Sequence, residues 1–318
     1  MKYDIYFHND FDGRASAAVM LAFLRSRGDE IEHFTPVNYN LLPQWLDEKF
    51  FTKHKLFKGK RNPAIVVDFL YHPAAVFWFE HHPTTFKKPQ WKKNFKPDKQ
   101  HRLEPDYPSC CHLVYASLKQ DFKWKSPKHI KDLVKWLDVI DGALYTSAKQ
   151  TILMKEPALQ IDAYIDSTEH DHKKTVKLIE LLSREPLARI AALPEVKRAA
   201  TRVRKENIKG IAFYKKNIKL FKNGSFIDFT RTRIEAPHFI ANYLYPKLLY
   251  VVRLSMRNGL YHLGVGASPW LRGKSRIHIG ELLKKYGGGG HKEVGGVEFQ
   301  RRDEAELASV EIMAVLGK

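Results

Sequence analysis

Three short apolar segments of this chain each run directly into carboxylate or histidine side chains. Residues 2–7 lead into His8, residues 64–67 into Asp68, and residues 75–79 into Glu80. Such short apolar runs are typical of buried strands, and the Ala- and Leu-rich stretch 15–24 between the first two has helical character. Strands that alternate with helices predict a mostly parallel, doubly wound sheet. A sheet of this kind gathers functional residues at the carboxyl ends of its strands.

A length of 318 residues suits two domains rather than one. We predict an α/β protein in which residues 1–150 form the doubly wound, mostly parallel domain. Residues 151–207 are rich in Lys, Arg and Glu and predict a helical connector. Residues 208–318 predict a smaller mixed α/β domain, with a hairpin at Asn223-Gly224 and a helix over 277–286 that four glycines end.

The composition indicates a soluble, intracellular protein. No apolar run approaches the 18 or so residues that a membrane span needs, and the first residues do not resemble a signal peptide. We therefore expect a cytoplasmic protein without a membrane partner. The two cysteines, Cys110 and Cys111, are adjacent, which argues against a disulfide framework or a structural zinc site and favours helix or core positions.

The net charge of +19 bears on partners rather than on fold. It favours a polyanionic substrate such as nucleic acid. The densest basic stretch covers residues 87–102, where Trp91 and Phe95 stand among lysines. Basic and aromatic side chains together can follow a nucleic-acid backbone and stack on bases. A solvated insertion loop explains the same stretch equally well.

The segment from His8 to Gly13 carries three possible metal ligands, His8, Asp10 and Asp12. They occupy alternate positions, so in an extended chain they project to one side. Hard divalent cations prefer carboxylate oxygens, and histidine adds affinity for manganese, iron or zinc. Taken alone, the same segment also fits a turn with helix-capping aspartates.

Three further groups have the residue types of a metal site. Asp68 ends an apolar strand, and Glu80 is followed by His81 and His82, whose side chains point to opposite sides of an extended segment. Asp138 and Asp141 share one face of a predicted helix. Each group alone is equally consistent with a solvated strand end or a helix cap. Together they place carboxylates and imidazoles at the ends of three strands of one sheet.

This set resembles the DHH phosphoesterase superfamily. The matching residues are His8-x-Asp10-x-Asp12-Gly13, Asp68, Glu80-His81-His82 and Asp141-x-x-x-Tyr145. The run Gly287-Gly288-Gly289-Gly290-His291, followed by Gly295-Gly296, is similar to the DHH-associated substrate-binding domain of RecJ-like exonucleases and nanoRNA-degrading oligoribonucleases. Family II pyrophosphatases resemble the first domain but carry a different second one.

The resemblance implies a two-metal site. His8 and Asp10 would bind one ion, Asp12, His81 and Asp141 the other, and Asp68 would bridge them. His82 would contact the scissile phosphate, so that Asp68, His81 and His82 form the catalytic group. Asp141 is preferred to Asp138 because an aromatic residue follows four positions later, and Asp138 is then a partner behind the ligands. Gly288, Gly289, Gly290 and His291 would bind substrate.

One departure from the family pattern is Glu80, which stands where the family has the first Asp of its name. The family's Asp acts behind the ligands, so the longer side chain predicts either a tolerated change or a weaker site with an altered metal preference.

The function implied is metal-dependent hydrolysis of phosphodiester bonds in short oligonucleotides or linear dinucleotides. Two divalent ions, manganese by preference and magnesium or cobalt as alternatives, would activate water for in-line attack. Polyphosphate or a small phosphomonoester such as adenosine bisphosphate is an alternative substrate, and an inactive nucleic-acid-binding relative is a second alternative. The expected partners are short single-stranded nucleic acid or another anionic phosphate, and the sequence leaves a homodimer open.

Overall fold

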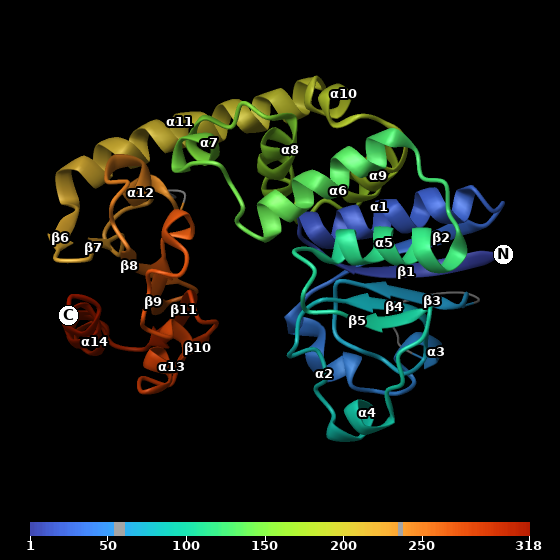
Figure 1. The fold of residues 1–318 in the computed structure, drawn as a ribbon, viewed down its shortest axis with the longest axis horizontal. Helices are drawn as coiled ribbons and strands as arrows, with labels where there is room; N and C mark the ends of the chain where they lie inside the picture. The colour runs from blue at the N-terminus through green and yellow to red at the C-terminus, as the bar shows by residue number, and fades with distance from the viewer. Residues whose placement is uncertain (54–60, 235–237) are drawn as a thin grey trace. The chain divides into compact units, whose positions relative to one another are not determined.

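The computed structural model describes residues 1–53, 61–234 and 238–318. The chain forms two compact units. The first comprises residues 1–144 and 156–200, and the second residues 145–155 and 201–318. The expected boundaries at 150 and 207 differ from this division, because residues 156–200 pack within the first unit instead of forming a separate connector. Figure 1 shows the elements of each unit.

The first unit is built on a five-stranded sheet in which every strand pair is parallel, in the order β2-β1-β3-β4-β5. This confirms the predicted doubly wound α/β architecture. Its strands are β1 (Lys2–His8), β2 (Glu30–Val37), β3 (Ala64–Val67), β4 (Ala75–Glu80) and β5 (His101–Leu103). Because β1, β3 and β4 lie side by side, their carboxyl ends meet at one edge.

Helices cover both faces of this sheet (Figure 1). On one face lie α1 (Phe11–Arg25), α5 (Cys110–Phe122), α6 (Lys128–Asp141) and α9 (His172–Arg184). The short helices α2 (Leu42–Trp45), α3 (Phe50–Lys53) and α4 (Pro89–Asn94) lie on the other. The 3-10 turn Tyr39–Leu41 and the helices α8 (Pro157–Asp166) and α10 (Leu187–Ala191) complete the unit.

The side chains of the central strands explain why both faces need cover. In β4, Phe77 and Phe79 enter the core beneath α1 and α5, while Trp78 enters the core on the opposite face with Trp45. Strands that are apolar on both sides are typical of parallel sheets with helices on each face. Cys110 and Cys111 are free and fully buried in the first of these cores, which confirms them as core residues.

The second unit contains a mixed six-stranded sheet in the order β10-β11-β9-β8-β7-β6, in which only β7 and β8 pair in parallel among the described strands. Its strands are β6 (Lys219–Phe221), β7 (Gly224–Asp228), β8 (Tyr250–Arg257), β9 (Leu260–Ala267), β10 (Gly289–Gly290) and β11 (Val294–Phe299). This confirms the predicted mixed α/β character, and the hairpin expected at Asn223 joins β6 to β7.

Helices α13 (Ile279–Lys284) and α14 (Arg302–Leu316) pack on one face of this sheet around Val252 and Leu263. The opposite face packs against Tyr214 and Ile240. These residues belong to α11 (Pro194–Asn217) and α12 (Ile240–Leu244), and α7 (Ala148–Leu153) and the 3-10 turn Pro269–Leu271 also lie in this unit. Helix α11 runs from the first unit into the second and continues beyond the expected connector end at 207.

Helices α2 and α3 are separated by a turn in which the Asp47 carboxylate accepts the backbone N–H of Lys49 and offers a local alternative to helix. The basic stretch 87–102 contains α4 and the start of β5. Trp91 is 4% exposed against Tyr71 and His72, and Phe95 is partly buried on a neighbouring core, so Trp91 is a core residue, while a nucleic-acid contact by this stretch stays a prediction.

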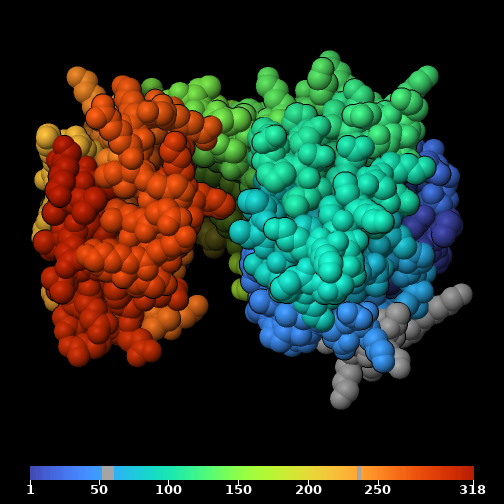
Figure 2. Space-filling view, turned by 60° about the horizontal axis from the view of Figure 1, so that its bottom comes forward, coloured from blue at the N-terminus to red at the C-terminus, as the bar shows by residue number. Residues whose placement is uncertain are grey.

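The teal part of the chain that includes this stretch faces the viewer in Figure 2, and all of the lysines in the stretch except the partly buried Lys88 are exposed. Among the described parts of the chain, no helix is both long enough and apolar enough to cross a membrane.

Candidate functional site

The carboxyl ends of β1, β3 and β4 bring together the side chains that the sequence singled out. Three overlapping groups have ligand atoms within 4.8 Å of one another. They are Asp68 with Glu80, His81 and His82; His8 with Asp10 and Asp68; and Asp12 with His81 and Asp141. Each group consists of the carboxylate and imidazole donors that divalent transition metals prefer, so each could hold a metal ion.

Asp68 lies at the centre of this arrangement. It directly follows β3 and has a φ of 55°, in the left-handed region that aspartate tolerates better than most residues. Its carboxylate is buried, and neither oxygen has a hydrogen-bond partner among the described residues. His8, His81 and His82 nitrogens lie 3.7 to 3.9 Å from its oxygens. A buried, unpaired carboxylate is costly unless a cation completes it.

The loop after β1 positions His8 and Asp10. Asp10 is the N-cap of α1, where its Oδ1 accepts the N–H of Gly13 at 2.9 Å, and its Oδ2 lies 2.7 Å from His8 Nδ1. Gly13 allows this turn because a Cβ at that position would lie 2.1 Å from the carbonyl oxygen of His8. Gly13 is therefore required because the backbone of His8 passes close to the first turn of α1.

Asp12 is held by the first turn of a distant helix. Its two oxygens accept the backbone N–H groups of Cys110 and Cys111 at 2.6 and 2.9 Å. These N–H groups are free because they lie at the N-terminus of α5, where an anion is stabilised by the helix dipole. Ser109, the N-cap of α5, fixes that helix start.

The two histidines after β4 are oriented by different partners. His81 Nδ1 lies 3.0 Å from the carbonyl oxygen of Tyr107, so the ring donates there and turns Nε2 toward Asp12, Asp68 and Asp141. A backbone carbonyl behind a metal-binding histidine is a common arrangement. The Nε2 atom of His81 is buried without a hydrogen-bond partner in the described chain, as expected of an atom that awaits a metal.

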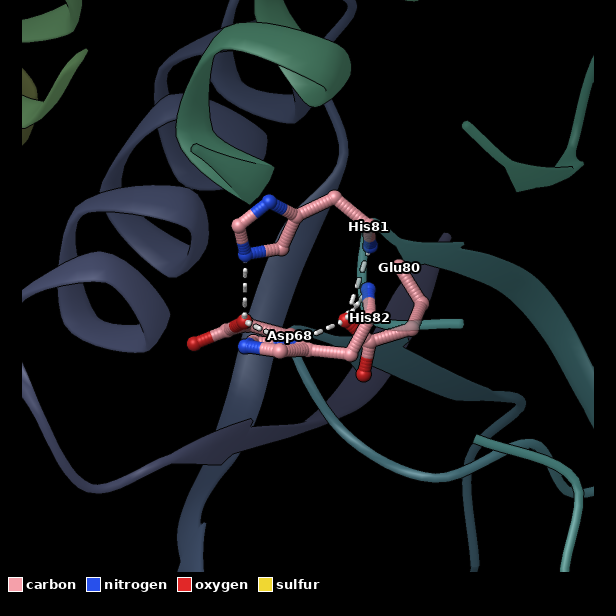
Figure 3. Close-up of side chains that lie close together, drawn as sticks. All are labelled: Asp68, Glu80, His81 and His82. Carbon is pink, nitrogen blue, oxygen red and sulfur yellow. Dashed lines mark hydrogen bonds and ion pairs between the residues drawn. The ribbon is translucent and has the colours of Figure 1, made fainter. Parts of the chain in front are cut away.

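His82 is held by Glu80 (Figure 3). Glu80 Oε1 accepts the backbone N–H groups of His81 and His82 at 2.8 and 2.9 Å, and it also lies 2.8 Å from His82 Nδ1. Its longer side chain thus folds back onto the two residues that follow it. This contact raises the pKa of His82, whereas burial lowers the pKa of His81. His82 is therefore suited to carry a proton, and His81 to offer a neutral nitrogen.

Asp141 and Asp138 have different surroundings. Asp141 Oδ2 lies 3.4 Å from His81 Nε2 and belongs to the third ligand group. Asp138 instead accepts a hydrogen bond from Ser109 Oγ at 2.9 Å and lies 2.9 Å from His112 Nδ1. The geometry thus places Asp138 behind the site, where it supports the start of α5.

The electrostatics of the cluster also suit a cation. Burial and the neighbouring Asp12 raise the pKa of Asp68 well above its usual range, and burial and Asp141 do the same to Asp12. Burial and Asp10 raise the pKa of Asp141 to about 7. Carboxylates crowded together in this way repel one another, and the unpaired atoms of Asp68 and His81 show that the residues present fit a bound metal.

In the second unit, part of the glycine run forms a strand. Gly289 and Gly290 form β10 against β11. A Cβ at Gly288 would lie 2.5 Å from Gly296 O, and one at Gly290 would lie 2.3 Å from Val294 O, so packing alone requires these two glycines. At Gly289 a Cβ would meet no described atom within 4 Å, and His291 is exposed. A substrate role for Gly288, Gly289, Gly290 and His291 remains a prediction.

Sequence reasoning missed several supporting groups. The Tyr107 carbonyl contacts His81, and the amides of Cys110 and Cys111 hold Asp12. The N-cap pattern of Ser109 was the one available signal, because it predicts where free helix N–H groups begin.

No family model matches the chain, and no curated protein matches it in sequence. Solved structures do match it. A pGpG-specific phosphodiesterase from Vibrio cholerae has a TM-score of 0.74 and 20% identity, covering 99% of this chain and 98% of its own. A DHH-domain protein described as a member of a family of ribosomal proteins has a TM-score of 0.61 and 18% identity over 98% and 86% of the two chains.

RecJ from Thermus thermophilus, solved in complex with Mn²⁺, has a TM-score of 0.60 and 15% identity over 99% of this chain and 52% of its own. At these identities the likeness shows a shared fold.

Proposed function

We propose that this chain, which has the fold of DHH-superfamily phosphoesterases, is a two-metal phosphodiesterase that hydrolyses short oligonucleotides or linear dinucleotides. The observation that carries the proposal is Asp68, a buried carboxylate that has no described hydrogen-bond partner and is shared by two of the three ligand groups. In this proposal His8 and Asp10 bind one ion, Asp12, His81 and Asp141 bind the other, and Asp68 bridges them.

Divalent ions held there would supply Lewis acidity and an activated water, and manganese is our preferred metal. The chain's own residues would do the rest. His82, held by Glu80 Oε1 and with a raised pKa, would donate a hydrogen bond to a phosphate oxygen and offset the charge that develops there. The Tyr107 carbonyl would keep the lone pair of His81 Nε2 directed at the ligand group.

One observation favours nucleotides over polyphosphate. Tyr39 is 53% exposed, and its ring centre lies 5.7 Å from that of His8. An exposed aromatic face beside the site can stack on a nucleobase, which polyphosphate lacks. The fold shared with a pGpG-specific phosphodiesterase further supports a dinucleotide as substrate.

The test is manganese-dependent hydrolysis of 5′-labelled RNA oligomers of graded length, starting with pGpG, beside polyphosphate and adenosine bisphosphate. Asp68→Asn keeps the shape and the left-handed backbone of the residue but removes its charge, and it should abolish turnover. Asp132→Asn, at an exposed position on α6, is the matched control and should leave turnover intact. Absence of oligomer hydrolysis by metal-loaded protein would overturn the proposal.

Tyr39→Ala separates the two substrate classes. If the ring stacks on a base, the variant should raise KM for pGpG by about tenfold, because stacking contributes about 1–3 kcal/mol per base. Any turnover of polyphosphate should be unchanged. An equal effect on both substrates would indicate that Tyr39 supports the site and does not contact a base.

A further inference from the structure

Arg14 is a charged side chain that the mechanism does not use, yet it is completely buried. It follows Gly13 in α1 and has 0% of its surface exposed. Its Nε and Nη2 atoms donate to Asn9 Oδ1 at 3.3 and 2.9 Å, and its Nη1 atom has no partner among the described residues. A buried guanidinium is costly to retain unless its contacts matter.

Its partner Asn9 is held at both ends of its carboxamide. The oxygen accepts the fork of Arg14, and the Nδ2 atom donates to the carbonyl oxygen of Glu169 at 2.8 Å. Asn9 is itself 9% exposed and lies between His8 and Asp10 in the chain. The Arg14–Asn9–Glu169 series therefore ties the loop after β1 to the segment between α8 and α9.

The charges around Arg14 explain why an arginine is needed. A cavity of about 250 Å³ beside Asn9 is lined by Asp10, Asp162, Asp166 and Glu169. Burial lowers the pKa of Arg14, and the negative charges of Asp10, Glu169 and Asp166 act in the opposite direction. A permanent cation behind the loop thus offsets part of the repulsion among these carboxylates.

We propose that Arg14 and Asn9 are positioning residues that hold His8 and Asp10 in ligand geometry. This rests on the proposed metal site but concerns two residues that are not among its proposed ligands. A lysine cannot replace Arg14 in this role, because it is a point charge without the planar fork that grips one carboxamide oxygen with two N–H groups.

The experiment measures Mn²⁺ binding to the full chain by calorimetry and by electron paramagnetic resonance, without substrate. Arg14→Met, Arg14→Lys and Asn9→Ala should each weaken Mn²⁺ binding by about 10- to 100-fold, the usual loss when a group behind a metal ligand is removed. The double variant Asn9→Ala/Arg14→Met should lose little more than either single variant, because the two act as one clamp.

Arg25→Met is the matched control. Arg25 is an arginine of the same helix that contacts Ser183 at 3.2 Å and Glu180 at 3.6 Å in α9, at the far end of α1 from the proposed ligands. It should lower the unfolding temperature without changing Mn²⁺ affinity.

The outcomes separate the two proposals. If the wild-type chain binds no Mn²⁺, the proposed function fails. If the wild-type chain binds Mn²⁺ and Arg14→Met and Asn9→Ala bind it equally well, the positioning role is overturned even where those variants are less stable. Full affinity in Arg14→Lys would overturn the argument that the fork, and not the charge alone, is required.

Discussion

At the scale of a single residue, Glu80 shows how one additional methylene group changes which atoms a carboxylate can contact. The carboxylate reaches back to accept two amide N–H groups and faces the ring of His82, so a single oxygen fixes both histidines that follow it. We expected either a tolerated departure from the family's aspartate or a weakened site. The contacts show that the longer side chain of Glu80 reaches His82 from behind. Both alternatives stay predictions that a Glu80→Asp variant would distinguish by its Mn²⁺ affinity.

The two aspartates at the end of α6 allow a direct test of ligand assignment. Asp141→Asn should weaken Mn²⁺ binding strongly, because it removes a charged oxygen from the group with Asp12 and His81. Asp138→Asn should leave metal binding nearly intact and lower the unfolding temperature by a few degrees, because Asp138 holds Ser109 and His112. Calorimetric titration with Mn²⁺ and thermal unfolding distinguish the two. The opposite ranking would exchange their roles.

At the scale of elements, the sequence predicted β1, β3 and β4 of the first sheet and the residues at their ends, but it did not predict β5. This worked because apolar runs on a doubly covered parallel sheet leave a clear pattern, and because the proposed ligands His8 and Asp68 lie at the end of a strand and directly after one. The groups behind the ligands were not predictable in the same way. Asp12 accepts the backbone N–H of Cys110, which is 98 positions away in the sequence. His81 contacts a backbone carbonyl, and a backbone group leaves no pattern in the sequence.

The turn between β1 and α1 provides a prediction at this scale. Gly13→Ala should displace the carbonyl of His8, since the added Cβ would lie 2.1 Å from it and the backbone cannot yield easily. We expect lower stability and much weaker Mn²⁺ binding. Gly28→Ala serves as a control for loss of a glycine, since a Cβ there meets no described atom within 4 Å, although its φ of 76° costs some stability. Normal metal binding by Gly13→Ala would contradict the argument.

At the scale of the whole molecule, the buried carboxylates link folding to pH. Burial raises the pKa of Asp141 and of Asp162 to about 7, whereas an unfolded aspartate has a pKa of about 4. The folded state then binds more protons than the unfolded state between these values. The free energy of unfolding of the metal-free protein should therefore fall as pH rises from about 4 to about 7.

Urea denaturation at a series of pH values measures this slope. Asp162→Asn should make the slope shallower, because it removes one of the groups that must lose a proton in a buried site. Saturating Mn²⁺ at pH 8 should restore stability, since an ion that binds only the folded state stabilises it. If the free energy of unfolding of the metal-free protein instead rises over the same pH range, folding does not raise the pKa of these carboxylates.

The two-unit organisation also belongs to this scale. The domain boundaries could not be located from sequence, because residues 156–200 read as a uniform helical stretch although α8, α9 and α10 complete the first unit. Helix α11, one continuous helix, passes into the second unit at residue 201.

The left-handed backbone of Asp68 means that the residue giving the most stable fold at this position differs from the residue that the proposed reaction needs. Glycine suits a φ of 55° better than any other residue and would remove a buried carboxyl group that has no described hydrogen-bond partner. Asp68→Gly should therefore raise the unfolding temperature of the metal-free chain while it eliminates turnover. If the proposed activity holds, Asp68 is retained for chemistry at the expense of stability.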